Sequence, residues 1–347
     1  MLTDIRVSCS PHISKHLSTR SVMIDVIIAL APAMLAAGYY FRVHALLLIC
    51  TCVISCVATE WLCNVICKKP NSLGDFSAVV TGIILALSLP PRSWPNWQII
   101  MIAVIGGVVS IAIGKMVFGG LGANIFNPAM VGRTFLTASF GVMMTTWAVP
   151  YTMDLNMSKI GPDNISASNT KEFRTQATPL AWSKMAIKNE LGADLYSELQ
   201  LKATLTGEVG GSLGETSVIA LLIGGIYLLI RRTINFHIPL AVITSAFVFA
   251  TIAFLRDSYT YVPPLFHLSS GGLMLCAFFI ATDPVTAPLT RRGMWIFGIG
   301  VGAITMLIRI VGVYQEGVMF SVLLMNAVTP LIDRLCRRIP TGGKPGA

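Results

Sequence analysis

The chain has 347 residues, of which 54% are hydrophobic and only 12% are charged, and its formal net charge is +9. This composition excludes an ordinary soluble domain, because such domains carry about 25% charged residues. The basic residues lie in short loops beside apolar runs and form no basic stripe, so the positive charge indicates membrane topology and not nucleic-acid binding. We therefore expect a membrane protein that contacts lipid and no nucleic acid.

Apolar runs of the length that crosses the roughly 30 Å hydrocarbon core of a bilayer recur along the chain. The predicted spans cover residues 22–40, 44–66, 76–90, 97–114, 124–149, 213–230, 237–255, 265–282, 293–311 and 316–335. The third run is short for a full span, and we expect it to be tilted or partly broken. The sequence therefore predicts an all-α polytopic membrane protein with about ten transmembrane helices.

The basic residues of the loops orient these spans, because cytoplasmic loops carry an excess of Lys and Arg. If the N-terminus lies in the cytoplasm, the short outer loops hold only Arg42, Arg92 and Arg256. The inner side then holds Arg6, Lys15, Arg20, Lys68, Lys69, Lys115, Arg231, Arg232, Arg291, Arg292, Arg334, Arg337, Arg338 and Lys344. We therefore expect both termini in the cytoplasm and the long polar insertion, residues 150–212, on the outer face.

The spans before and after this insertion have opposite orientations. Segments interrupted by Gly or Pro occur in both halves, at 88–91 and 120–128 in the first and at 282–288 and 326–330 in the second. Such a pattern is typical of an inverted repeat with broken helices. The predicted domains are a cytoplasmic arm (1–21), a first five-helix half (22–149), an extracytoplasmic insertion (150–212), a second five-helix half (213–335) and a cytoplasmic tail (336–347).

Several polar residues fall at or near membrane depth, where an ionisable group is costly and usually has a partner inside the protein. They are Asp25, Glu60, Asn127, Arg133, Asp283, Arg309, Glu316 and Asn326. For those near span ends, a headgroup-level or helix-capping role is the simplest interpretation. Arg133 and Arg309 lie well inside their spans, so for these two residues an internal salt bridge or a cofactor contact is an equally good interpretation. Asp283 can either cap a half-helix or bind an ion.

The cysteines and histidines predict no metal site. One face of the second predicted helix carries Cys52, Cys56, Cys63 and Cys67. Iron–sulfur ligands usually lie in tight loop motifs, so this helical spacing indicates packing instead. His12 and His16 lie in the polar N-terminal arm, where contact with the membrane surface is the simpler interpretation. We also find no nucleophile–base pair, and we expect no catalytic residue for hydrolysis.

Motifs spread over almost the whole chain resemble the RnfD/NqrB family. They are Gly74–Gly82 with Leu87–Pro91, Gly119–Met130, Gly210–Ser217, Thr282–Thr286 and Leu323–Asp333. Their joint occurrence is very specific. The chain lacks the longer N-terminal extension of the Nqr-type subunit, so the resemblance is closer to the RnfD branch.

The resemblance implies a urea-transporter-like membrane fold and a place in the ion-translocating Rnf ferredoxin:NAD oxidoreductase. The chain would carry electrons between reduced ferredoxin and NAD, coupled to translocation of Na⁺ or H⁺, in a bacterial inner membrane. Its partners would be the other subunits of that complex, namely RnfA, RnfB, RnfC, RnfE and RnfG. This chain alone would hold no complete active site.

Within the insertion, the segment Glu172–Thr178 resembles the family's flavin-acceptor pattern, Asp-x-x-Ser/Thr-x-Ala-Thr. The resemblance implies that a flavin transferase uses FAD to join FMN, through its phosphate, to the hydroxyl of Thr178. Glu172 replaces the usual Asp and keeps its charge. Judged alone, so short a motif is better explained by an ordinary turn before Pro179, and it is the resemblance that favours the flavin acceptor. The resemblance also allows a second, noncovalent flavin such as riboflavin, whose site no motif of the chain identifies.

Two other functions fit the same spans. An inverted repeat suits a solute channel or transporter of urea-transporter-like fold. A structural scaffold of a redox complex needs the spans but no working flavin. A flavin that stays on the polypeptide in SDS distinguishes the flavoprotein from both alternatives.

Overall fold

The computed structural model describes residues 18–91, 96–147, 150, 178–180, 204–205, 207, 209–312 and 314–336. Within these ranges every regular element is a helix, and no strand occurs. Most of the predicted insertion, including the residues from Glu172 to Ala177, lies outside the described residues.

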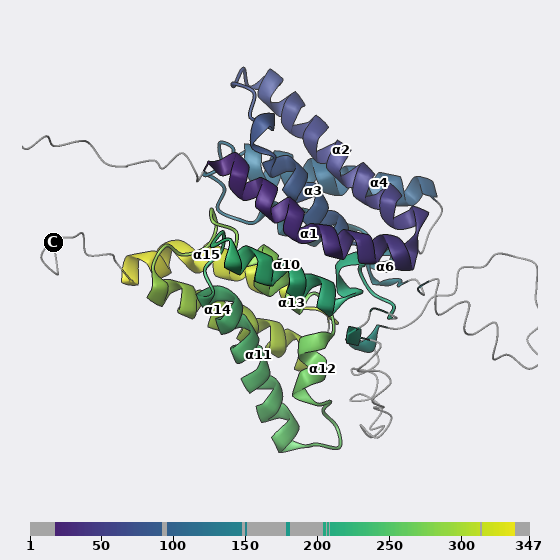
Figure 1. Ribbon diagram of the computed structural model, residues 1–347, viewed down its shortest axis with the longest axis vertical. Coiled ribbons are helices and arrows are strands. Elements are labelled where there is room, and N and C mark those ends of the chain that lie inside the picture. Colours follow the sequence, from purple (N-terminus) through teal and green to yellow (C-terminus); the bar gives the residue numbers. More distant parts are fainter. Residues whose placement is uncertain are drawn as a thin grey trace, which may run out of the picture.

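The first group of helices precedes the insertion. It consists of α1 (Thr19–Phe41), α2 (Val43–Ile66), the 3-10 turn η1 (Leu73–Asp75), α3 (Ser77–Leu87), α4 (Asn96–Ile111), the π-helical turn η2 (Ala112–Met116), α5 (Pro128–Ser139) and α6 (Gly141–Thr145). Within this group α2 packs against both α3 and α4, and α4 packs against α5. Figure 1 shows α1 to α4 together in the upper part of the molecule.

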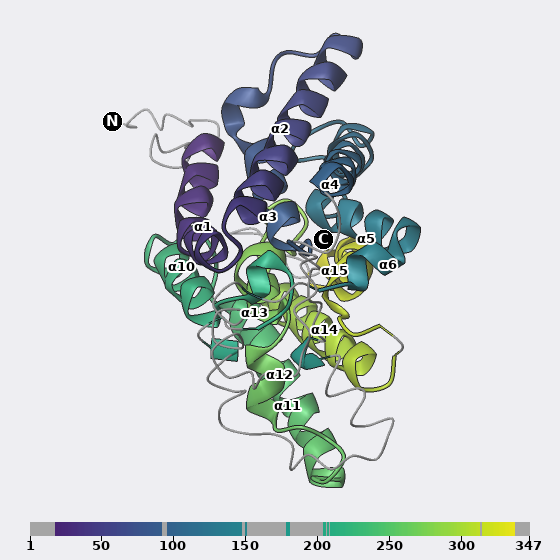
Figure 2. The ribbon, with the colours of Figure 1, turned by 90° about the vertical axis from the view of Figure 1, so that its right-hand side faces the viewer.

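The second group follows the insertion. It consists of the 3-10 turn η4 (Leu213–Glu215), α10 (Val218–Ile230), α11 (His237–Arg256), α12 (Pro264–Ser269), α13 (Leu273–Leu275), the π-helical turn η5 (Cys276–Ile280), α14 (Arg291–Ile310) and α15 (Val318–Leu335). The most extensive pairing is that of α11 with α14, and α15 packs on α14. The two groups meet where α10 lies along α1 and where α15 packs on α5 (Figures 1 and 2).

The length and composition of the helices are those of a polytopic membrane protein. Among the described residues, six helices are long and apolar enough to cross a membrane: α1, α2, Trp97–Met116, α11, α14 and α15. Two further apolar helices, α3 and α10, are shorter. Large apolar side chains such as Leu35, Ile230 and Leu255 are more than two-thirds exposed, which suits contact with lipid.

Two predicted spans are broken, for local reasons. In the span predicted at 124–149, α5 begins only at Pro128 because Asn127 caps it, and the non-helical backbone of Phe140 separates α5 from α6. In the span predicted at 265–282, residues 270–272 interrupt the helix between α12 and α13. Such interruptions are tolerated at membrane depth only where protein groups bind the freed backbone.

Glycines allow the closest helix contacts. A Cβ atom placed on Gly302 of α14 would overlap Ser245 Oγ and would lie 2.6 Å from the carbonyl oxygen of Val242, both on α11. A Cβ atom on Gly224 of α10 would overlap the carbonyl oxygen of Ala29 on α1. Small residues at such contacts are the usual means by which membrane helices pack closely.

We expect Gly302→Ala to lower the free energy of unfolding by about 1–3 kcal/mol, because α14 must move away from α11. The matched control is Gly38→Ala in α1, where nothing lies within 4 Å of the added Cβ; this change should be neutral or stabilising by up to about 1 kcal/mol. Thermal unfolding of both variants in detergent tests the difference. Equal midpoints would contradict the packing described here.

Candidate functional site

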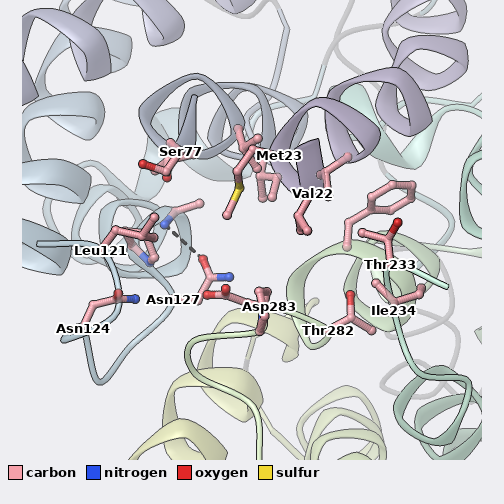
Figure 3. A pocket seen from close by; sticks show the side chains of 18 of the residues that line it. Val22, Met23, Ser77, Leu121, Asn124, Asn127, Thr233, Ile234, Thr282 and Asp283 are labelled. Atoms are coloured by element: carbon pink, nitrogen blue, oxygen red, sulfur yellow. Dashed lines mark hydrogen bonds between the residues drawn. The ribbon is translucent and has the colours of Figure 1, made fainter. Parts of the chain in front are cut away.

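A pocket lies between the two groups of helices (Figure 3). On one side it is walled by α1, α3 and the segment that leads into α5, and on the other by α10, η5 and the residues up to Pro284. The space between these walls is about 720 Å³ when the part open to solvent is counted. Apolar side chains dominate the lining, and the polar ones include Ser77, Thr81, Lys115, Asn124, Asn127, Thr282 and Asp283.

Two asparagines at the start of α5 shape this pocket. Asn127 Oδ1 accepts hydrogen bonds from the amides of Ala129 (3.1 Å) and Met130 (3.4 Å), and its Nδ2 donates to the carbonyl oxygen of Ile280 at 3.3 Å. It therefore caps α5 and ties the first group of helices to the second. Asn124 donates to the carbonyl oxygen of Phe126, whereas its Oδ1 is buried without a hydrogen-bond partner. A buried acceptor without a partner indicates a place where a ligand or water donates.

A buried ion pair borders the same pocket. Lys115 Nζ lies 2.8 Å from both carboxylate oxygens of Glu60 and 2.5 Å from Ser77 Oγ. Both charged side chains are almost fully buried. The loop-charge pattern placed Lys115 among the loop cations, but Lys115 lies in the π-helical turn η2 and is buried against Glu60. A buried carboxylate such as Glu60 requires a cation beside it. Such π-helical turns frequently occur at functional sites.

Of the other polar residues predicted at membrane depth, Asp283 and Asp25 have hydrogen-bond partners and Asn326 does not. Asp283 accepts from the amide of Val285 (3.2 Å) and the hydroxyl of Thr286 (3.3 Å), so it shapes the turn beside the pocket. Asp25 accepts from Arg231 Nη2 at 3.3 Å. Asn326 is buried in α15, and its side-chain amide has no hydrogen-bond partner among the described residues.

A second cluster of charges lies at the break between α12 and α13. Arg133 from α5 forms an ion pair with Glu316, and Glu316 also accepts a hydrogen bond from the backbone amide of Gly272. Arg309 from α14 donates to the carbonyl oxygens of His267 (2.6 Å) and Ser270 (3.1 Å). We call Arg133, Arg309 and Glu316 the break cluster. It brings together three of the polar residues predicted at membrane depth.

Glu215 joins this cluster electrostatically, although it was not among the polar residues predicted at membrane depth. It interacts with Glu316, Arg133 and Arg309, and it accepts a hydrogen bond of 2.5 Å from Ser212 Oγ. The signal in the sequence was the glycine-rich motif Gly210–Ser217, in which Glu215 is the only charged residue. Nε of Arg133 and Nε of Arg309 are buried without partners, so the cluster keeps unused donors.

Thr178, the predicted flavin acceptor, lies in a short described segment, 178–180, beside the break cluster. Thr178 is 3% exposed and Leu180 is 4% exposed. The tip of Leu180, Cδ1, lies 2.6 Å from the position that a Cβ atom on Gly271 would occupy, and Arg309 Nη2 lies at the same distance from it. The structure thus brings the segment that follows the acceptor threonine to Arg309.

The four cysteines of α2 differ in their surroundings. Cys52 and Cys56 are buried, Cys63 is half-buried and Cys67 is exposed, and none of them is in a disulfide. Cys56 Sγ lies 3.9 Å from the carbonyl oxygen of Gly107 on α4. The packing interpretation is therefore confirmed for Cys52 and Cys56. No group of three or more metal-ligating side chains occurs within the described part of the chain.

We expect Glu316→Gln to destabilise the protein by about 3–5 kcal/mol, because it removes the charge that pairs directly with the buried guanidinium of Arg133. The double variant Arg133→Met/Glu316→Gln removes the unpaired charge and should recover much of that loss. The free energies of unfolding of Arg133→Met, Glu316→Gln and the double variant in detergent give the coupling energy between Arg133 and Glu316. Additive effects would contradict a direct pair.

Comparison with known proteins confirms the resemblance that the motifs indicated. The family model for NQR2, RnfD and RnfE matches residues 6–342. The chain is 44% identical over 335 residues to the D subunit of the Na(+)-translocating ferredoxin:NAD(+) oxidoreductase complex of Acetobacterium woodii, covering 96% of this chain and 94% of the relative. It is 41% identical over 343 residues to the D subunit of the proton-translocating ferredoxin:NAD(+) oxidoreductase complex of Clostridium ljungdahlii, covering 97% and 96%. The chain therefore belongs to the NQR2, RnfD, RnfE family.

Proposed function

We propose that this chain is the flavin-carrying D subunit of an ion-translocating ferredoxin:NAD oxidoreductase complex. The relatives named above support this role, because they match nearly the whole chain. One of them is named for Na⁺ and the other for protons, and the identities are close, at 44% and 41%. We therefore include ion translocation by the complex in the proposed role, with either ion.

The observation that carries the proposal is the place of Thr178. This residue ends the acceptor pattern that begins at Glu172, and its segment lies against the membrane helices beside Arg309. In our proposal FMN is held by a phosphodiester to the Thr178 hydroxyl. The protein then supplies position and positive charge, and the isoalloxazine ring, when bound, supplies the electron transfer.

We assign a second, noncovalent flavin such as riboflavin to the pocket between the two groups of helices. The pocket lies between the two groups of helices and its lining is mostly apolar, as a flat aromatic ring system requires. Asn124 Oδ1, which is buried without a partner, is suited to accept a hydrogen bond from a ring N–H. Thr282 and Asp283 line the opposite wall (Figure 3) and are suited to orient the ligand.

The proposed architecture is that of two inverted five-helix halves in a bacterial inner membrane, with both termini cytoplasmic. The residues around the pocket come from segments that the loop-charge rule assigns to the inner side, such as the loop after Lys115 and the turn at Asp283. The break cluster and Thr178 come from segments that the rule assigns to the outer side. The two sites therefore support one common orientation, with the covalent flavin on the outer side and the other partner subunits of the complex around these helices.

The decisive variant is Thr178→Val, which keeps the branched shape but removes the hydroxyl. We expect it to insert and assemble, to lose flavin fluorescence in denaturing gels, and to abolish electron transfer from ferredoxin to NAD by the complex. The control is Thr175→Val, which should keep its flavin. A fluorescent band and a flavin-mass adduct on the Thr178→Val chain would favour the channel or the scaffold instead.

For the noncovalent flavin we expect Asn124→Leu to weaken binding about tenfold, since it removes a polar group that faces the ligand. Flavin that is released by denaturation should fall, while flavin that stays on the polypeptide should not change. Ile125→Ala, at an exposed position of the same loop, is the control. Unchanged release from the Asn124→Leu variant would exclude this pocket as the second flavin site.

A further inference from the structure

Two short described pieces of the insertion, 178–180 and 204–205, contact the same place in the membrane core. Leu180 packs against Gly271, and the hydroxyl of Thr204 lies 3.1 Å from that of Ser269. Ser269 is the last residue of α12, and Gly271 lies in the break between α12 and α13. Residues 178–180 therefore rest on the break (residues 270–272), and we call the break together with Ser269 before it the seat.

The backbone of the seat allows Leu180 to approach it closely. Gly271 has a φ of +70°, a conformation that favours glycine. A Cβ atom there would lie 2.6 Å from both Leu180 Cδ1 and Arg309 Nη2. Arg309 binds the carbonyl oxygens on one side of the break, and Glu316 binds the amide of Gly272 on the other. The charges therefore hold the backbone in the shape that accepts Leu180.

The acceptor threonine, two residues before Leu180, is buried in the same arrangement. Thr178 is 3% exposed. In flavin transfer its hydroxyl oxygen attacks the FMN-side phosphorus of FAD, the bond from that phosphorus to the bridging oxygen breaks, and AMP leaves. The hydroxyl proton passes to a base of the transferase. An attacking oxygen must come within about 3–3.5 Å of the phosphorus, and a buried side chain cannot enter the active site of another protein.

We infer that Thr178 receives its flavin only while residues 178–180 are off the seat. This inference rests on the proposed function, since it concerns the same threonine. Local opening of a segment held by few buried contacts needs much less free energy than global unfolding. Leu180 is the contact that controls the opening, because it is the apolar side chain that packs on Gly271.

The first test measures the rate of flavin attachment to the full-length chain, produced without the transferase and then incubated in detergent with transferase and FAD. We expect Leu180→Ala and Gly271→Ala to accelerate loading about tenfold, which corresponds to about 1.4 kcal/mol of seating free energy. The matched control is Leu255→Ala, a leucine that is 78% exposed at the end of α11, and its rate should equal that of the unaltered chain. Equal rates in all four chains would overturn the inference.

The second test needs no flavin. It therefore separates the inference about the seat from the proposal that Thr178 carries FMN. A maleimide should label Thr178→Cys slowly, and about tenfold faster when Leu180→Ala is added; mass spectrometry of the peptide that contains position 178 avoids the native cysteines. Tyr259→Cys, at a residue 58% exposed, serves as the fast reference. Labelling of Thr178→Cys at the reference rate would overturn the inference. Slow labelling with no flavin ever found on the unaltered chain would leave the seat intact and contradict the proposed function.

Discussion

A helix that is interrupted inside a membrane leaves carbonyl and amide groups that lipid cannot bind, and the break between α12 and α13 meets this constraint with charged side chains. Arg309 donates to the carbonyl oxygens of His267 and Ser270, and Glu316 accepts from the amide of Gly272. The charges in turn require partners, and Arg133 from α5 supplies one. One backbone interruption therefore ties together α5, α14 and the loop before α15, and it creates the surface on which Leu180 rests.

At the pocket, too, a buried charge requires partners inside the protein. Glu60 on α2 is fully buried and is compatible with the membrane core because Lys115 and Ser72 both bind it. Lys115 in turn contacts Ser77, the first residue of α3. Removal of one partner from such a pair costs more than removal of both, since the remaining charge stays buried. The two ion pairs thus stabilise the two places that we propose for the flavins.

Pairing of these charges could be predicted only in part. Their depth in the apolar runs indicated that Arg133 and Arg309 needed partners inside the protein, and both have them. Which partners they have was not visible, because Arg133 and Glu316 are separated by 183 positions in the chain. Lys115 likewise looked like an ordinary loop cation, because its partner Glu60 lies 55 positions away in the chain. Helix capping was one of the roles predicted for the polar residues near span ends, and Asn127 does cap α5, but its bond to Ile280 depends on how the two groups of helices meet.

The sequence by itself determined the membrane class, the approximate places of the apolar helices, the family and the candidate acceptor Thr178, because composition, local periodicity and short motifs are properties of neighbouring residues. The tertiary structure alone decided where two spans break, which charges pair, and where the pocket lies. It also decided that Thr178 is buried and that Leu180 meets Gly271 and Arg309. Those features depend on contacts between segments far apart in the chain, and no local pattern encodes which distant side chain satisfies a buried charge or an interrupted backbone.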